Sequence, residues 1–163
     1  MVSSGSNSIH IHEDNDFHGM RKAGQLAAAT LDFITPHVQP GVTTEELDRL
    51  CHGFILDNNA VPAPLNYKGF PKSICTSINH VVCHGIPGAR RLDEGDILNI
   101  DVTVILDGWY GDTSRMFGVG KVAVKAARLI DVTYECLMRG IEVVKPGATL
   151  GDIGHAIQEY AEN

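Results

Sequence analysis

Two aspartates, Asp101 and Asp112, lie within a stretch that otherwise predicts a buried β-hairpin, NIDVTVILDGWYGDTS at residues 99–114. An ionised carboxylate in apolar surroundings costs free energy unless a proton, a cation or a metal compensates its charge. The first question that this sequence raises is therefore what compensates these two carboxylates.

The expected geometry of the hairpin places the two aspartates on the same face. Asp-Gly at 107–108, between two apolar runs, is typical of a two-residue type I′ turn. That turn fixes a register in which Asp101 faces Ser114 and Thr103 faces Asp112. Because side chains alternate along a strand, these four share one face, with the aspartate Cα atoms roughly 7–8 Å apart. The other face is mostly apolar and is predicted to be the core side.

Three interpretations of the aspartate pair remain open from spacing alone. The pair could bind a metal, lie on a solvated sheet face, or act as an acid/base pair like that of a glycosidase. Carboxylate oxygens suit Mg, Mn, Fe, Co or Zn ions. Two ligands are too few for any of these ions, so a metal site would need further ligands from elsewhere.

His84 is the next candidate, in the segment VVCHGIPG at residues 81–88. We expect an apolar strand before it and a Gly/Pro turn after it, and the ends of strands often carry functional residues. A structural histidine is the alternative. Adjacent strand residues point to opposite faces, so Cys83 and His84 are not expected to form a nucleophile–base pair.

Helices are predicted before and after the strand-rich segment. The periodicity of residues 17–34 indicates a helix with Asp16 as its N-cap. Thr43 and Glu46 form a T-x-x-E capping box for a second helix. Pro, Gly and β-branched residues dominate residues 60–120, and the pattern is helical again after Gly120.

An internal repeat links the two helical parts. PGVTTEEL at residues 40–47 resembles PGATLGDI at residues 146–153, and the same offset aligns Leu31 with Leu137. Two independent helix starts are the alternative to a duplication. We expect a flexible N-terminal arm over residues 1–15 and one incomplete domain over residues 16–163. In that domain, 16–120 would be the first repeat and 121–163 the start of the second.

Composition excludes several classes of function. The net charge of -7 without a basic cluster argues against nucleic-acid binding. No apolar run approaches the roughly 18 residues that span a membrane, and the N-terminus has no signal-peptide pattern. The four cysteines form no C-x-x-C pair, which favours reduced thiols and a cytoplasmic location.

Two segments together resemble the type I methionine aminopeptidases: NYKGFPKSICTSINHVVCHGIPG at 66–88 and LDEGDILNIDVTVILDGWYGDTSRMF at 92–117. The resemblance extends over residues 16–163. It implies an α+β pita-bread fold, represented here by the N-terminal half and the first helices of the second half. It also implies a cytoplasmic hydrolase that removes the initiator methionine from nascent proteins.

The resemblance further implies a site with two divalent metal ions, of which Co, Mn, Fe and Zn are the candidates. Asp101 and Asp112 match two metal ligands, with Asp112 bridging both ions. His84 matches a catalytic histidine that contacts the substrate amide. Tyr67, Phe70 and Cys75 match the substrate-binding pocket for the methionine side chain, and Pro64 replaces a cysteine found in some members.

The family's other ligands, one histidine and two glutamates, have no match in these 163 residues. His155 is not a substitute, because the repeat aligns it with Arg49, a helix residue outside the site. We therefore expect the chain to be inactive alone. The expected partners are peptide N-termini beginning with Met, with the ribosome as a further candidate. A non-catalytic pita-bread binding module and an Xaa-Pro-type aminopeptidase relative are the alternative functions.

Overall fold

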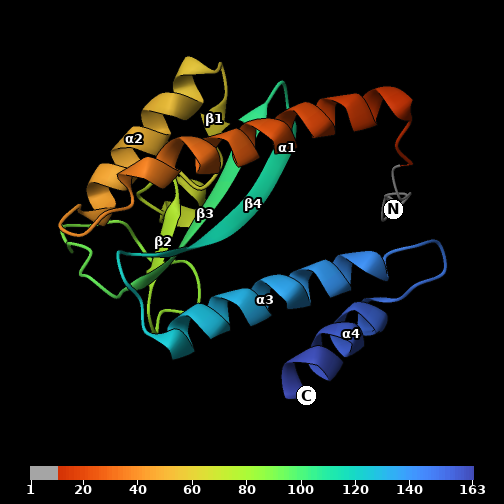
Figure 1. Ribbon diagram of the computed structural model, residues 1–163. Helices are drawn as coiled ribbons and strands as arrows, with labels where there is room; N and C mark the ends of the chain where they lie inside the picture. Colours follow the sequence, from red (N-terminus) through yellow and green to blue (C-terminus); the bar gives the residue numbers. More distant parts are fainter. Residues whose placement is uncertain (1–10) are drawn as a thin grey trace, which may run out of the picture.

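The structure is a computed structural model that describes residues 11–163. It has the expected α+β architecture, in which two helices cover one side of a four-stranded sheet and two more lie together on the other side (Figure 1). The elements in chain order are α1 (Asp14–Ile34), α2 (Thr44–Asp57), β1 (Val61–Pro62), β2 (Cys75–Ile78), β3 (Ile97–Leu106), β4 (Trp109–Gly118), α3 (Val124–Glu142) and α4 (Leu150–Glu162).

The sheet is antiparallel and centred on β3, which pairs with β4 on one side and with β1 and β2 on the other. In the β3–β4 hairpin, Asp101 pairs with Ser114 and Thr103 with Asp112, which confirms the predicted register. Both turn residues at 107–108 have positive φ, as a type I′ turn requires.

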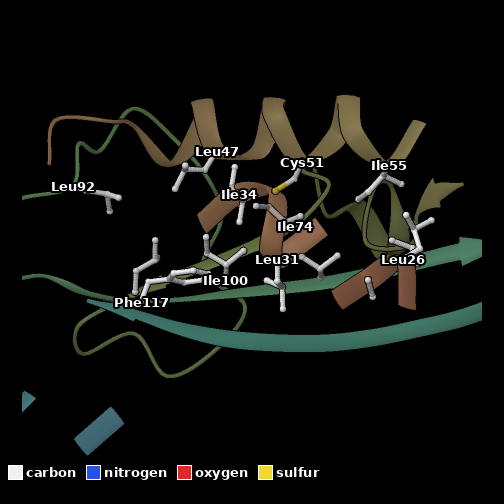
Figure 2. Packing of buried hydrophobic residues seen from close by; sticks show 14 of the residues in the cluster. Leu26, Leu31, Ile34, Leu47, Cys51, Ile55, Ile74, Leu92, Ile100 and Phe117 are labelled. Carbon is white, nitrogen blue, oxygen red and sulfur yellow. The ribbon is translucent and has the colours of Figure 1, made fainter. Parts of the chain in front are cut away.

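The hydrophobic core lies between the sheet and the first two helices. Ile100, Val102 and Val104 of β3 are fully buried on the predicted core face. Figure 2 shows leucines and isoleucines of α1 and α2 converging on this face and on Ile74, which precedes β2. Burial of these side chains is the main favourable contribution to folding.

Helix α1 packs unusually close to β4. A Cβ atom on Gly111 would lie 2.1 Å from the backbone oxygen of Ala23, and one on Gly19 would lie 2.3 Å from Nε1 of Trp109. Glycine is therefore required at position 111, where the neighbour is backbone, whereas a side chain at position 19 would have to displace the Trp109 ring. This contact fixes the strand immediately before Asp112.

The N-terminus of α1 differs from the prediction. The helix begins at Asp14, inside the predicted arm, and its N-cap is Glu13 rather than Asp16. Asp16 is the third helical residue, and its Oδ2 accepts a hydrogen bond from the Glu13 N–H at 3.0 Å. Asp16, the predicted N-cap, therefore lies inside the first turn, where it and Glu13 form the reciprocal hydrogen bonds of a capping box. Residues 1–10 of the predicted arm lie outside the described residues.

The strand predicted immediately before His84 is wrong. Strand β2 ends at Ile78, and Asn79 turns the chain with a φ of 53°. The Asn79 side chain donates to Asp96 Oδ1 at 2.7 Å and accepts from the Ile97 N–H at 3.0 Å. A contact with the start of β3 thus ends β2, and His84 lies in the irregular segment that follows.

The second helix of each pair, α2 or α4, starts in the same way. Thr43 and Thr149 cap α2 and α4 through their side-chain oxygens, and the preceding Gly41 and Gly147 have φ of 88° and 89°. The capping box predicted for α2 is only half formed, because the Glu46 side chain accepts from Arg49 instead of from the Thr43 backbone. Helix α4 has a complete box, formed by Thr149 and Asp152. The division into a first repeat and the start of a second stays a prediction. Among residues 11–163, no helix has both the length and the apolar character needed to cross a bilayer.

Candidate active site

One pocket of about 680 Å³ brings the predicted site residues together. Its lining has two parts of different chemistry, a carboxylate wall and an apolar wall. The predicted residues that line it are Tyr67, Phe70, Cys75, His84, Asp101 and Asp112. The pocket has the size typical of small-ligand sites.

The carboxylate wall consists of Asp101 on β3 and Asp112 on β4. Burial raises the pKa of Asp101, the negative charge of Asp112 raises it further, and His84 acts in the opposite direction. Among residues 11–163, no Lys or Arg forms a salt bridge with either aspartate. Arg115, which the register directs to the other face, binds Asp32 of α1 at 2.9 Å instead. Within the described residues, no Lys or Arg salt bridge therefore neutralises the two carboxylates of this wall.

This wall fits a metal ion as part of a larger ligand set. Two carboxylates with uncompensated charge are suitable ligands for a divalent ion. However, no group of three His, Cys, Asp or Glu side chains in the described part of the chain could hold a metal. Two carboxylates are fewer ligands than a divalent ion requires, so a metal held at this wall would need others.

The loop that carries His84 is fastened directly to β2. The Thr76 N–H donates to the Gly85 carbonyl at 2.8 Å, and a Cβ on Gly85 would lie 2.1 Å from the Thr76 oxygen. His84 itself has a φ of 55°, which is uncommon for a residue other than glycine. This conformation places His84 at the pocket while the neighbouring Cys83, which is exposed, does not line it.

The apolar wall is built from a tight turn and from β2. Tyr67 and Phe70 flank the turn, which a hydrogen bond from the Phe70 N–H to the Tyr67 carbonyl closes at 2.9 Å. Cys75 lies opposite Asp101 across the β2–β3 pair. Burial, together with the charge of Asp101, raises the pKa of the Cys75 thiol to about 11. The thiol is therefore protonated at neutral pH and contributes apolar surface rather than a nucleophile.

Other pocket residues were not predicted from the sequence. Thr103 and Tyr110 line the pocket. They share a hairpin face with Asp112, so the alternation of side chains along a strand would have predicted both of them. Lys68 and Ile86 also line it. Lys68 lies in the single 3-10 turn Tyr67–Gly69 and Ile86 in an irregular segment, and neither is long enough or regular enough to give a periodic signal for the direction of a side chain.

Comparison with known proteins identifies the class. The model of metallopeptidase family M24 matches residues 18–163, and the chain belongs to this family. Within the family, the chain is 72% identical over 155 residues to the methionine aminopeptidase of Rickettsia prowazekii. It is 53% identical over 157 residues to the methionine aminopeptidase of Escherichia coli K12.

Solved structures agree with the sequence comparison. The crystal structure of methionine aminopeptidase from Rickettsia prowazekii superposes with a TM-score of 0.93 and covers 95% of this chain. The fold is therefore the pita-bread fold, in part. An Xaa-Pro dipeptidase from Bacillus anthracis, 20% identical with a TM-score of 0.80, shares the fold alone.

The chain covers only part of each relative. The chain spans about 60% of the length of the Rickettsia protein and 60% of the Escherichia coli protein, although 95% of this chain is matched in each case. The catalytic activity of the relatives is therefore a proposal for this chain.

Proposed function

We propose that this pocket is one part of a methionine aminopeptidase site that removes the initiator methionine from nascent proteins in the cytoplasm. One observation carries the proposal: the pocket joins two uncompensated carboxylates to an apolar wall of Tyr67, Phe70 and Cys75. An aminopeptidase for methionine needs both features, a metal site at the scissile bond and an apolar site for the side chain.

In this proposal Asp101 and Asp112 would be two of the residues that hold two divalent ions, with Co, Mn, Fe and Zn as candidates. When bound, the ions would polarise the scissile carbonyl and activate a water for hydrolysis. The aspartates, on a rigid hairpin, keep the ligand oxygens in fixed positions. Further ligands must come from outside residues 11–163, so we propose that these residues do not hydrolyse peptides by themselves.

His84 and the apolar wall act on the substrate. His84 would contact the substrate amide and help to stabilise charge that develops there. Its position in the pocket lining, on a loop that is hydrogen-bonded to β2, supports this role. Tyr67, Phe70 and Cys75 exclude water from the methionine side chain. The partners proposed are peptide N-termini that begin with Met, presented as the chain leaves the ribosome.

The test compares the 163-residue chain with a joined protein. The joined protein combines this chain with the portion of the Rickettsia enzyme that has no counterpart in it. With Mn or Co added, we expect the joined protein to release methionine from a Met-Gly peptide and the chain alone to give no turnover above the blank. Asp101→Ala and Asp112→Ala should each abolish turnover of the joined protein.

Two outcomes would contradict the proposal. Turnover by the chain alone would show that Asp101 and Asp112 need no further ligands from outside the chain. Turnover that persists in both Asp101→Ala and Asp112→Ala would show that these residues do not belong to the site. The absence of a third metal ligand among residues 11–163 favours a second candidate function, a non-catalytic binding module. A folded joined protein that binds Met peptides without hydrolysing them would support this second function.

A further inference from the structure

One face of α2 holds the chain that leads into the pocket. Three of its residues, Glu45, Asp48 and His52, lie on the same side of the helix because of their spacing. Each contacts the short segment 72–74, which runs between Phe70 and Cys75 in the apolar wall of the pocket.

Asp48 makes the central contact. Its Oδ1 accepts hydrogen bonds from the backbone N–H groups of Ser73 at 2.8 Å and of Ile74 at 3.1 Å. Asp48, Ser73 and Ile74 are all buried, with exposures of 8%, 2% and 0%. Hydrogen bonds to an ionised carboxylate are about twice as strong as neutral ones. The loss of this acceptor would leave two buried donors without a partner.

The flanking contacts differ in kind. Glu45 binds the Lys72 ammonium at 2.8 Å, but its side chain is 60% exposed, so this pair contributes little. His52 Nδ1 lies 2.8 Å from Ser73 Oγ, a distance that a nucleophile and its base would have. Ser73 is buried and does not line the pocket, so no substrate reaches it there. The pair therefore supports the segment and has no catalytic role.

The position of the segment determines the position of Cys75. Ile74 is followed directly by Cys75, the first residue of β2 and the partner of Asp101 in the sheet. A carboxylate that anchors residues 73 and 74 thus fixes the apolar wall relative to the carboxylate wall.

We propose that Asp48 is a positioning residue that sets the geometry of the methionine pocket through Ser73 and Ile74. The identity of the ligand rests on the proposed function, whereas the anchoring does not. Asp48 does not line the pocket and acts through the segment that it holds. Its negative charge also contributes to the raised pKa of the Cys75 thiol, and Asp48→Asn removes that charge while it keeps the acceptor oxygen.

The test uses the 163-residue chain in a metal-free buffer. We compare Asp48→Ala and Asp48→Asn with Glu45→Ala, the matched control on the same helix face. Two readouts are followed: hydrogen exchange of the Ser73 and Ile74 amides, and the rate of Cys75 alkylation by N-ethylmaleimide, mapped by mass spectrometry. The buried Cys51 and Cys136 report global unfolding, and the exposed Cys83 reports full reactivity.

We expect Asp48→Ala to speed exchange of both amides and alkylation of Cys75 about tenfold or more, the effect of losing buried hydrogen bonds. Cys51 and Cys136 should keep their slow rates. Asp48→Asn should remain near the wild-type rate, because the amide oxygen can still accept both bonds. Glu45→Ala should change neither readout.

Three results would overturn the proposal. An unchanged alkylation rate of Cys75 in Asp48→Ala would show that Asp48 does not anchor the segment. Equal acceleration at Cys51, Cys75 and Cys136 would show a general effect on folding. A variant Asp48→Asn as reactive as Asp48→Ala would show that the acceptor oxygen is not what matters.

A kinetic measurement separates this proposal from the proposed function. In the joined protein, Asp48→Ala should raise KM for a Met-Gly peptide more than it lowers kcat, because the site for the side chain is displaced. If the wild-type joined protein is inactive, the proposed function fails, and the Cys75 readout still decides the role of Asp48.

Discussion

Helices α1 and α2 pack against the sheet, whereas α3 and α4 pack mainly against each other. The second helices of the two pairs, α2 and α4, nevertheless share a preceding Pro-Gly, whose glycine has φ near 88°, and a threonine cap. The difference shows in burial: α1 buries six residues, α3 buries two and α4 none. Caps and turns are thus determined locally, while the contribution of a helix to stability depends on the surface it covers.

The largest expected effect compares two aligned leucines. Leu31 of α1 is 2% exposed and Leu137 of α3 is 52% exposed. Leu31→Ala should lower the free energy of unfolding by about 2–5 kcal/mol, because it leaves a cavity in the core. Leu137→Ala should change it by no more than about 0.5 kcal/mol. Urea denaturation followed by circular dichroism measures both, and equal losses would contradict the comparison.

A second comparison concerns glycines at the two helix contacts. Gly111→Ala would bring a methyl group against the Ala23 backbone oxygen, which cannot move without displacing α1. We expect a loss of about 1–3 kcal/mol or more. Gly140→Ala in α3 would place a methyl group 3.2–3.4 Å from side-chain atoms of Ile153 and Ile157, a tight contact that a small shift of these side chains relieves. Thermal unfolding should show a much smaller change there, within about 1 kcal/mol. The reverse order would mean that α3–α4 is the tighter contact.

The two caps should behave alike. Thr43→Ala and Thr149→Ala each remove an acceptor for a backbone N–H, at 3.1 Å from Glu46 and 3.4 Å from Asp152. Each should destabilise its own helix by about 1 kcal/mol. Hydrogen exchange of the two capped amides checks this, with each variant serving as the control for the other. An effect at Thr43 alone would show that the caps depend on packing.

The smallest effect is a pH dependence. Burial alone would raise the pKa of Asp96, but hydrogen bonds from the Asp93 backbone and Asn79, together with Arg90, outweigh it and lower the pKa. The ionised carboxylate therefore stabilises the fold above the ordinary aspartate pKa of 3.8, and this stabilisation is lost as the pH falls through the folded value.

Asp96→Asn should accordingly lower Tm at pH 7. The difference in Tm between the variant and the wild type should shrink as the pH falls from the ordinary aspartate pKa of 3.8 through the lower pKa of the folded state. The matched control in the second helix pair is Asp152→Asn. The pKa of Asp152 is also lowered, first by its hydrogen bond from the Thr149 backbone, but the side chain is exposed. A larger Tm change at Asp152 than at Asp96 would contradict the comparison between the two regions.

The sequence allowed the hairpin to be predicted in detail because its geometry is local. The Asp-Gly turn sets the register, and the register places Asp101 and Asp112 on one face. The start of α1 was predicted less well. Asp16 satisfies the usual preference for an N-cap, yet it serves equally well as the third residue of a capping box, and the sequence does not distinguish the two.

The segment before His84 could not be predicted, because a distant residue ends the strand. Asn79 bonds to Asp96, which lies 17 residues away, and this contact stops β2 before the apolar Val81 and Val82. The pocket likewise joins residues of several separate segments. Their roles as ligands and substrate contacts come from the family resemblance and stay predictions.

The exposure of Cys83 has a practical consequence. The other three cysteines are buried, and Cys83 is adjacent to the pocket residue His84. The unmodified sequence therefore allows one environment-sensitive dye to be attached at the edge of the pocket without engineered mutations. Fluorescence from that dye would report metal or peptide binding in real time, independently of any turnover.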